Sequence, residues 1–513
     1  MVINVLEYLE TTATRYSDKI ALCDDKNAIT FQQWHMYAEN IGTAIHKQLN
    51  CNILRSPVLV FVDRKIDCLI GFMGVVASGN FYVPVDSKMP SERINLIIGI
   101  LNPVAAIVST TNEKQLLLDI NFGGKIFLLD EIKNAVADKK ILSSIKKSII
   151  DTDPLYAIFT SGSTGVPKGV IISHKGVIDL AEWLIDTFDF TNNDSLGNQT
   201  PFYFDGSVKD IYICLKTGAT LNVIGKKYFT FPKLLIQFLN EHKITSILWA
   251  TSAVVLIGNS NILETNKPLY VNKVFFAGEA MPAKQLKVWM NKLPDAQYIN
   301  LYGPTEITVD CTYYIVNRDF ADDECIPIGY PCRNMEVLVL NEHNELVKTE
   351  EEGELCVRGT GVSMGYFNNT KKTDEVFVQN PLHNSYRDII YRTGDIVKYN
   401  THGELVFCSR KDFQIKHMGN RIELGEIENA VNSLSHVTNA VCIYDTDDHK
   451  IVLFYTTDTG NELDIVNNIK QKIPKYMFPN IIILKENLPY NMNGKIDRLE
   501  LKKIYLNEKN HRS

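Results

Sequence analysis

The sequence predicts an α/β protein with a large N-terminal domain of parallel sheets covered by helices and a small α+β domain after it. Three observations support this prediction. Short β-branched runs alternate with stretches of helical apolar spacing over the first part of the chain. Strands then follow one another from about residue 325, and helices and strands mix again after Asp412. A chain of 513 residues has room for more than one domain.

The first part of the chain alternates helices with buried strands. Apolar residues recur at helical spacing over 31–49, and residues 57–62 form an apolar, β-branched run typical of a buried strand. A second helix is expected over 66–77 and a second strand over 81–85. Further strands are expected at 105–108, 125–129 and 244–249. This alternation favours parallel sheets with helices packed on their faces.

In the rest of the chain, the alternation of helices and strands gives way first to consecutive strands and then to a mixed α+β pattern. A compact antiparallel β subdomain is expected over about 325–408, with strands at 335–340, 353–358 and 403–407. The predicted boundary lies between Lys411 and Asp412, so the domains are 1–411 and 412–513. The smaller domain is expected to contain a helix over 423–434, strands at 440–444 and 451–455, and a helix over 465–472.

Composition excludes several classes of protein. Lys plus Arg is 53 and Asp plus Glu is 60, so the net charge of −7 argues against a nucleic-acid partner. None of the 10 cysteines forms a C-x-x-C pair, which argues against a zinc ribbon or a dithiol redox site. We see no signal peptide and no apolar stretch of the ~20 residues that a bilayer requires. A cytoplasmic protein without a membrane partner is expected.

A run rich in glycine and hydroxyl groups follows a probable strand at 156–159. It reads Thr160-Ser161-Gly162-Ser163-Thr164-Gly165-Val166-Pro167-Lys168. Small residues let backbone N–H groups approach an anion, the hydroxyls add donors, and Lys168 adds charge. The spacing differs from a Walker A loop. The run therefore predicts a polyphosphate-binding loop, with an ordinary turn as the simpler alternative.

Four later stretches add polar side chains suited to a nucleotide. In 300–306, Tyr302 is expected to expose an aromatic face, and Thr305 with Glu306 suits a phosphate oxygen and Mg²⁺. In 391–395, Asp395 is suited to accept from two ribose hydroxyls. Residues 410–416 are polar and lie at the predicted domain boundary. Residues 493–498 place Lys495 on an Asn-Gly turn, where a lysine is more often simply solvated.

Together and in this order, the five stretches resemble the adenylate-forming superfamily. That family contains acyl- and aryl-CoA synthetases, luciferases, adenylation domains of non-ribosomal peptide synthetases and D-alanine–carrier protein ligases. The resemblance extends over about residues 6–501. It implies an enzyme that uses ATP and Mg²⁺ to convert a carboxylic acid into an acyl-adenylate and pyrophosphate, after which a thiol displaces AMP.

The resemblance also implies roles for individual residues. The catalytic residues would be Lys495, Thr305 and Glu306, with Glu306 binding Mg²⁺. The small C-terminal domain would be mobile and rotate about a hinge at Asp412. At Ser409, before Arg410, the family usually has glycine. The implied ATP-binding residues are Thr160, Ser161, Gly162, Ser163, Thr164, Gly165, Lys168, Gly278, Glu279, Ala280, Tyr302, Asp395, Phe407 and Arg410.

The stretch 204–208 resembles the branch of the family that activates amino acids. There Asp205 would pair with the substrate's α-ammonium, since a buried ammonium needs a carboxylate partner. Capping of the following helix is the alternative role for this side chain. The implied pocket is lined by Gly206, Lys209, Leu248, Phe275, Ala277, Leu301, Val309 and Asp310.

The pocket suits a small amino acid if Phe275 and Leu301 make it shallow. Two charged residues complicate this. Lys209 and Asp310 either pair with each other and close the floor, or one of them faces a polar substrate side chain. The sequence decides neither between these two arrangements nor the stereochemistry of the substrate, although residues 413–428 resemble the corresponding stretch of D-alanine–carrier protein ligases.

The thiol acceptor is expected to be the phosphopantetheine of a separate carrier protein. Only 18 residues follow Lys495, which leaves no room for a carrier domain in this chain. Coenzyme A is the second candidate. The competing functions are an acyl- or aryl-CoA ligase and a non-catalytic nucleotide-binding scaffold of the same fold.

Overall fold

The computed structural model divides the chain into two compact units. The first contains Met1–Ser87, Ile100–Ile158 and Gly169–Lys411, and the second contains Lys88–Gly99, Phe159–Lys168 and Asp412–Ser513. Two short segments from early in the sequence therefore belong to the second unit. The structure describes residues 2–49, 53–162, 165–322, 324–458, 464–489 and 496–510.

The first unit contains a nine-stranded sheet whose central strands are parallel. Antiparallel strands extend it at both edges, because β2 (Ala28–Thr30), β14 (Thr312–Ile315) and β15 (Tyr330–Pro331) run against their neighbours. The strand order is β15 (Tyr330–Pro331), β14 (Thr312–Ile315), β13 (Gln297–Tyr302), β12 (Lys273–Ala277), β11 (Ser246–Ala250), β9 (Ser195–Asn198), β10 (Thr220–Val223), β1 (Ile20–Cys23) and β2 (Ala28–Thr30).

A six-stranded sheet lies in the earlier part of the chain. Its strands pair in parallel from β6 to β7. All six residues of β3 are buried, as expected for a strand covered on both faces. The order is β6 (Lys125–Leu128), β5 (Ala105–Val108), β3 (Pro57–Val62), β4 (Phe81–Asp86), β7 (Pro154–Thr160) and β8 (Lys168–Ser173).

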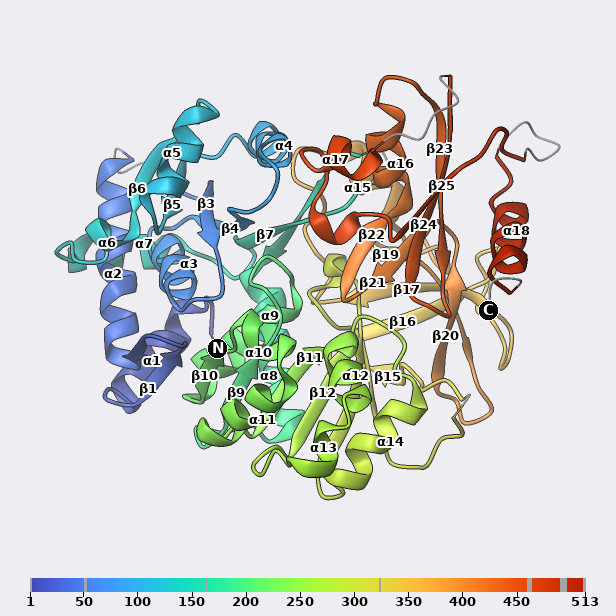
Figure 1. Ribbon diagram of the computed structural model, residues 1–513. Coiled ribbons are helices and arrows are strands. Elements are labelled where there is room, and N and C mark those ends of the chain that lie inside the picture. The colour runs from blue at the N-terminus through green and yellow to red at the C-terminus, as the bar shows by residue number, and fades with distance from the viewer. Residues whose placement is uncertain are drawn as a thin grey trace. The chain divides into compact units, whose positions relative to one another are not determined.

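Helices connect the strands of these sheets. Residues of α3 (Asp67–Ala77), α8 (His174–Phe188) and α9 (Gly206–Thr217) share one hydrophobic core with strands of both sheets, and Figure 1 shows α3 beside β3. The helices are α1 (Leu6–Arg15), α2 (Phe31–Gln48), α3 (Asp67–Ala77), α4 (Ser91–Leu101), α5 (Thr111–Asp119), α6 (Leu129–Ile132), α7 (Lys139–Ser148), α8 (His174–Phe188), α9 (Gly206–Thr217), α10 (Lys226–Thr230), α11 (Pro232–Glu241), α12 (Thr251–Asn259), α13 (Ile262–Thr265), α14 (Ala283–Lys292) and α15 (Thr370–Val376), with a 3₁₀ turn η1 (Thr305–Ile307).

An antiparallel sheet follows within the first unit. It contains β16 (Met335–Leu340), β17 (Gly353–Gly359), β18 (Phe377–Gln379), β19 (Ile389–Tyr399) and β20 (Leu405–Arg410). The predicted antiparallel strands are thus confirmed. The sheet begins at Met335 rather than near 325, because Tyr330 pairs with Tyr313 and so extends the nine-stranded sheet.

The second unit contains the hairpin of β21 (Gln414–His417) and β22 (Asn420–Glu423), and a three-stranded sheet with its own core. The predicted helix over 465–472 ends at Ile469, and Pro474 follows soon after, where a helix would need an N–H donor. The other elements are α16 (Leu424–Asn432), β23 (Val437–Asp445), β24 (Lys450–Thr457), α17 (Ile465–Ile469), η2 (Lys475–Met477), β25 (Ile481–Leu484) and α18 (Arg498–Asn510).

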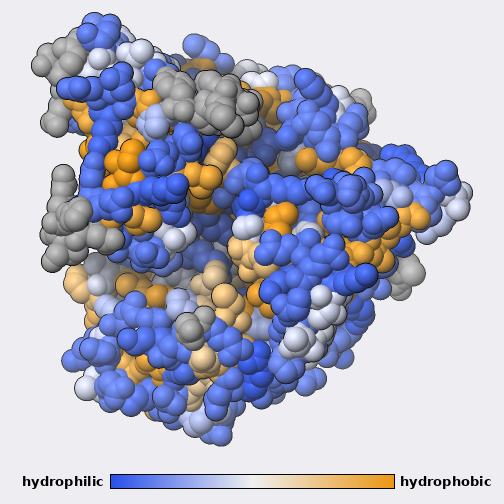
Figure 2. Space-filling model, turned by 90° about the vertical axis from the view of Figure 1, so that its right-hand side faces the viewer, coloured by the Kyte–Doolittle hydropathy of each residue, from blue (hydrophilic) through white to orange (hydrophobic). Residues whose placement is uncertain are grey.

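The predicted α/β class with parallel sheets is confirmed by this topology. Hydrophilic residues cover much of the face seen in Figure 2, and hydrophobic residues form separate patches on it. Over the part of the chain that the structure describes, no helix has the length and apolar character needed to cross a membrane.

Candidate functional site

Asp205 lies directly before α9, but it does not cap the helix. Its backbone is already helical, with φ −63° and ψ −27°, and its side chain makes no capping hydrogen bond. The capping alternative is therefore wrong. Burial raises the pKa of the Asp205 carboxyl, although a hydrogen bond with Thr305 and the charge of Lys209 act in the opposite direction. The carboxylate is thus a desolvated group beside Thr305, suited to a cationic partner.

Lys209 lies one helical turn after Asp205 and pairs with Asp310. Its Nζ is 2.9 Å from Asp310 Oδ2, and the two side chains are only 4% and 2% exposed. Of the two arrangements that the sequence left open, the structure has the one in which these charges pair with each other. The lysine charge is balanced by Asp310 at a distance where buried opposite charges attract strongly.

Apolar side chains predicted to line the pocket come from neighbouring parallel strands. Leu248 on β11 is in register with Phe275 on β12, and Ala277 on β12 is in register with Leu301 on β13. Phe275 packs edge-to-face on Phe188 at 4.9 Å between ring centroids. Ala277 and Leu301 lie at or near the carboxyl ends of their strands, the edge where ligands bind in open α/β sheets, and Leu248 and Phe275 lie at the middle of theirs.

Three of the predicted ATP-binding residues converge within the first unit. The Tyr302 hydroxyl donates to Asp395 Oδ2, and the Arg410 guanidinium donates to Asp395 Oδ1. Asp395 and Arg410 are directly paired on β19 and β20. Tyr302 is only 5% exposed, so the expected open aromatic face is wrong. Burial, and then the negative charge of Asp395, raise the pKa of the tyrosine hydroxyl well above its usual value.

Thr305 and Glu306 form the short turn η1. Glu306 is fully buried, and its Oε1 accepts a hydrogen bond of 2.8 Å from the hydroxyl of Tyr366. Sequence reasoning missed Tyr366, since an isolated tyrosine in a loop carries no recognisable signal. The contact orients the carboxylate that was predicted to bind Mg²⁺.

The remaining predicted nucleotide residues of this unit lie on a loop and on β20. Gly278 has φ +97°, a conformation that favours glycine. The Thr251 hydroxyl donates to the carbonyl of Glu279 at 3.1 Å and so anchors the loop before Ala280. Phe407 on β20 is 37% exposed, which leaves part of its ring open to solvent.

The glycine- and hydroxyl-rich loop belongs to the second unit, where carboxylates contact it. The Gly162 N–H donates to Glu426 Oε2 at 3.3 Å, and Lys168 Nζ lies 3.7 Å from Glu423 Oε1. The Ser161 hydroxyl donates to the carbonyl of Arg421 at 3.0 Å. The loop therefore presents its donors and its cation to anions, as a phosphate-binding loop would. Sequence reasoning missed both glutamates.

Glycine conformation and one buried hydroxyl further characterise this loop. A Cβ at Gly162 would come within 2.1 Å of the Val166 carbonyl oxygen, so only glycine fits there. Thr160 Oγ1 is buried and has no hydrogen-bond partner within the described part of the chain. Gly165 has φ +82°. Ser163 and Thr164 lie outside the described residues.

Two predicted functional positions lie in or near the C-terminal part of the second unit. Asp412 Oδ1 accepts a hydrogen bond of 3.3 Å from the backbone N–H of Gln414, at the start of the hairpin. The guanidinium of Arg498 lies 3.9 Å from the centroid of the Phe413 ring. Lys495 lies outside the described residues.

Asp210, next to Lys209 on α9, is a buried carboxylate whose ionisation should make the stability of the fold depend on pH. Burial raises its pKa to about 7, and Asn198 donates to its Oδ2 at 2.8 Å. In the unfolded chain the pKa of this carboxyl is near 4, so its ionisation disfavours the folded state. The free energy of unfolding therefore falls as the pH rises from about 4 to about 7. Asp210→Asn removes that ionisation. We expect it to stabilise the protein by about 1–3 kcal/mol at pH 8 and hardly at all at pH 4.

Thermal unfolding at the two pH values measures this difference. The exposed Asp18 gives the matched control variant Asp18→Asn, which should leave the melting temperature unchanged at both. A lower melting temperature for Asp210→Asn at pH 8 would show that the ionised carboxylate stabilises the fold.

Comparison with known proteins agrees with this geometry. A family model described as AMP-binding enzyme matches residues 9–367, and a model described as AMP-binding enzyme C-terminal domain matches residues 426–495. Tyrocidine synthase 1 of Brevibacillus parabrevis is 29% identical over 97% of this chain, which spans 45% of that protein. The D-alanine–D-alanyl carrier protein ligase of Staphylococcus aureus is 31% identical over 98% of this chain and 99% of its own length.

Among solved structures, NpsA-ThdA is similar in fold. It is an artificially fused adenylation–PCP di-domain NRPS from Klebsiella oxytoca, with a TM-score of 0.81 and 21% identity over 100% of this chain and 98% of its own. These likenesses support an AMP-forming ligase that adenylates an acid. On the two matching family models and the full-length relative, the chain belongs to the AMP-binding enzyme family.

Proposed function

We propose that the protein adenylates an amino acid with ATP and transfers the aminoacyl group to the phosphopantetheine thiol of a separate carrier protein. The observation that carries this proposal is the environment of Asp205. Its carboxylate is desolvated and does not cap α9. The nearby ammonium of Lys209 is 2.9 Å from a different carboxylate, Asp310. An α-ammonium on the substrate would supply the cation that Asp205 needs.

The same observation disfavours an acyl- or aryl-CoA ligase. A carboxylate removed from water without a cation costs several kcal/mol, because the local charge is uncompensated. Substrates without an ammonium group would leave Asp205 in that state. The α-ammonium of an amino acid would attract the Asp205 carboxylate and offset this cost. The positive charge of the substrate would therefore select amino acids over acids that lack an ammonium group.

The donor sets in the two units support ATP as the second substrate. Asp395, held by Tyr302 and Arg410, would bind the ribose. The loop around Gly162, whose N–H donates to a carboxylate here, would bind phosphates. Glu306 would contact Mg²⁺ together with phosphate oxygens, the ligand set that Mg²⁺ prefers. ATP would supply the adenylyl group, and Mg²⁺ would offset negative charge on its phosphates.

The relatives support a carrier protein as the thiol acceptor. One is named as a ligase that acts with a D-alanyl carrier protein, and NpsA-ThdA joins an adenylation domain to a PCP domain. Coenzyme A is the competing acceptor.

A pyrophosphate-exchange panel tests the proposal. The twenty amino acids and D-alanine would be compared with acids that lack an ammonium group, such as acetate and benzoate. We expect exchange with one or a few amino acids and none with the other acids. Strong exchange with benzoate or acetate would favour the CoA ligase. ATP binding in calorimetry without any exchange would favour the scaffold. The active amino acid is then offered with holo-carrier protein or with coenzyme A, and transfer to the carrier is expected.

Asp412→Pro tests the proposed hinge. Proline restricts φ to about −65° and removes the backbone N–H, so it should impede rotation about residue 412. We expect adenylation near the wild-type rate and a loss of thiol transfer. Single-turnover transfer from preformed aminoacyl-adenylate measures this directly, with Asp412→Asn as the control that keeps backbone freedom. Full transfer in the proline variant would contradict the hinge.

A further inference from the structure

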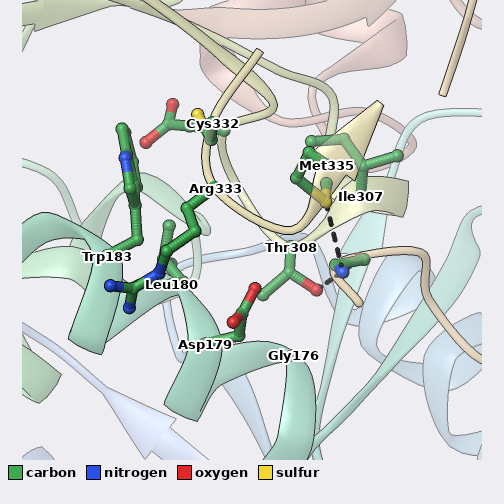
Figure 3. Close-up of a pocket in the computed structure, with 11 residues that line it drawn as sticks. Gly176, Asp179, Leu180, Trp183, Ile307, Thr308, Cys332, Arg333 and Met335 are labelled. Atoms are coloured by element: carbon green, nitrogen blue, oxygen red, sulfur yellow. Dashed lines mark hydrogen bonds between the residues drawn. The ribbon is translucent and has the colours of Figure 1, made fainter. Parts of the chain in front are cut away.

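The pocket drawn in Figure 3 is too small to hold a ligand. It lies between α8 and the turn after η1, where the hydroxyl of Thr308 donates to the carbonyl of Gly361 at 2.6 Å. Its volume is about 10 Å³, which is room for one water at most. A charged cluster without an assigned role lies instead on the antiparallel sheet, around Glu354.

Glu354 on β17 is a buried carboxylate that accepts hydrogen bonds from three donors. Its side chain is only 5% exposed. Its Oε2 lies 2.7 Å from Nη1 of Arg392 and 3.0 Å from Nζ of Lys411. Its Oε1 accepts a hydrogen bond of 3.2 Å from the backbone N–H of Gly394. Because the two cations and the N–H come from different directions, they hold the carboxylate in one orientation and offset its loss of hydration.

Two of these donors flank the pair of Asp395 and Arg410. Asp395 on β19 is directly opposite Arg410 on β20. Gly394 precedes Asp395, Lys411 follows Arg410, and the N–H of Lys411 donates to the carbonyl of Gly394 at 2.8 Å. Glu354 therefore holds the next position along both strands, one residue away from each member of the pair.

The strands are irregular where Glu354 holds them. Gly394 has φ +73°, in the left-handed region that favours glycine. The register of β17 against β19 shifts between Glu354 and Cys356, and the register of β19 against β20 shifts between Ile396 and Val397. A register shift interrupts the hydrogen-bond ladder, so the neighbouring strands fix the backbone less firmly there. The bond from the Gly394 N–H to Glu354 supplies an anchor at this irregular point.

Both oxygens of the Asp395 carboxylate already accept a hydrogen bond. Tyr302 donates to Oδ2, and Arg410 donates to Oδ1. Two ribose hydroxyls would therefore have to bind the remaining lone pairs of these oxygens. The direction of those lone pairs follows the orientation of the carboxylate, so a small displacement of β19 or β20 would misalign both hydroxyls. Ribose binding at Asp395 thus depends on the groups that hold the two strands beside it.

We propose that Glu354 is a positioning residue for the ribose of the nucleotide. Through Gly394 and Lys411, it fixes the pair of Asp395 and Arg410 in the orientation that binds both ribose hydroxyls. This rests on the proposed assignment of Asp395 to the ribose. Glu354 acts through that pair and does not touch the nucleotide, because it is buried and its oxygens accept from three protein donors. Loss of Glu354 should therefore weaken the binding of ATP more than the binding of an analogue that lacks a ribose hydroxyl.

Calorimetric titration with ATP, 2′-deoxy-ATP and 3′-deoxy-ATP tests this role without an amino acid. The wild type should bind ATP more tightly than either analogue. Glu354→Gln keeps the size of the side chain, removes its charge and replaces one acceptor oxygen with a donor. It should reduce the preference for ATP about 10-fold, since misplacing a positioning group by about 1 Å costs up to about 10²-fold. In pyrophosphate exchange, the KM for ATP should rise while kcat stays near wild type, because the ribose does not react.

A milder variant and a matched control complete the test. Lys411→Met removes one of the three donors and remains informative if Glu354→Gln fails to fold, because the Lys411 side chain is 52% exposed. It should reduce the preference for ATP about threefold, as expected for a partly exposed ion pair. Lys398, also on β19, pairs with Glu350 at 2.6 Å, so Lys398→Met removes a similar ion pair from the same strand and should keep the wild-type preference.

Three results would be decisive against parts of this scheme. An unchanged preference in folded variants, or equal weakening of ATP and both analogues, would overturn the role of Glu354. Equal affinity of the wild type for ATP and the deoxy analogues would overturn the assignment of Asp395 to the ribose, and the role of Glu354 with it. Absence of exchange with every amino acid would overturn the proposed function, while the calorimetric result would still decide the role of Glu354.

Discussion

Asp205→Ala is expected to reduce amino-acid-dependent pyrophosphate exchange by about 10²- to 10³-fold, because removing one partner of a buried ion pair costs about 3–5 kcal/mol. ATP affinity should stay close to wild type, since Asp205 is assigned to the ammonium of the amino acid and not to the nucleotide. The loss should appear chiefly as a higher KM for the amino acid, because the missing contact is made to an ammonium group that does not react.

Asp205→Asn refines this test by keeping the size of the side chain. It should lose nearly as much activity as Asp205→Ala, which would show that charge rather than volume matters. The exposed Asp295 gives the control variant Asp295→Asn, which should behave as wild type. If amino-acid dependence survived in Asp205→Ala, the assignment of Asp205 to the ammonium group would be wrong.

The raised pKa of Asp205 adds a pH dependence to this prediction. Only the ionised carboxylate attracts an ammonium, so amino-acid binding should weaken as pH falls through the raised pKa. The weakening should begin above the ordinary aspartate value near 3.9, since burial favours the neutral form. The acid-side rise in KM should be absent from Asp205→Asn, where nothing ionises at that position.

Lys495→Ala is expected to reduce adenylate formation by about 10²-fold or more, the usual effect of losing one preorganised charge at a reacting centre. The expectation follows from its place in 493–498 and the resemblance of that stretch, because Lys495 lies outside the described residues. Transfer from preformed aminoacyl-adenylate to the carrier should be spared, since the lysine is assigned to the first half-reaction only.

Lys485 provides the matched control for this lysine. It lies in the same unit and pairs with Glu508 at 2.7 Å, so Lys485→Ala removes the same charge elsewhere. We expect exchange in that variant to stay within about twofold of wild type, because the pair is partly exposed and lies outside the predicted site. Exchange at a near-normal rate in Lys495→Ala would contradict the assigned role.

The fold class and the family followed from patterns that lie close together in the chain. The apolar run of β3 and the helical spacing of α2 reflect local burial, so their limits could be predicted to within a residue or two. The glycine-rich loop and the 300–306 stretch carry their chemistry within a few consecutive residues. Such patterns can be recognised without knowing what packs against them.

Contacts between residues far apart in the sequence could be identified only in the folded structure. Lys209 and Asp310 are 101 positions apart, and their pairing depends on how α9 is set against the turn after η1. The burial of Tyr302 against Asp395 depends on β13 meeting the sheet that carries β19. The Tyr366–Glu306 bond arises in the same way. Composition and spacing specify which side chains can pair, whereas packing specifies which of them come within 3 Å of each other, because that distance is set by strand register and helix placement across the whole unit.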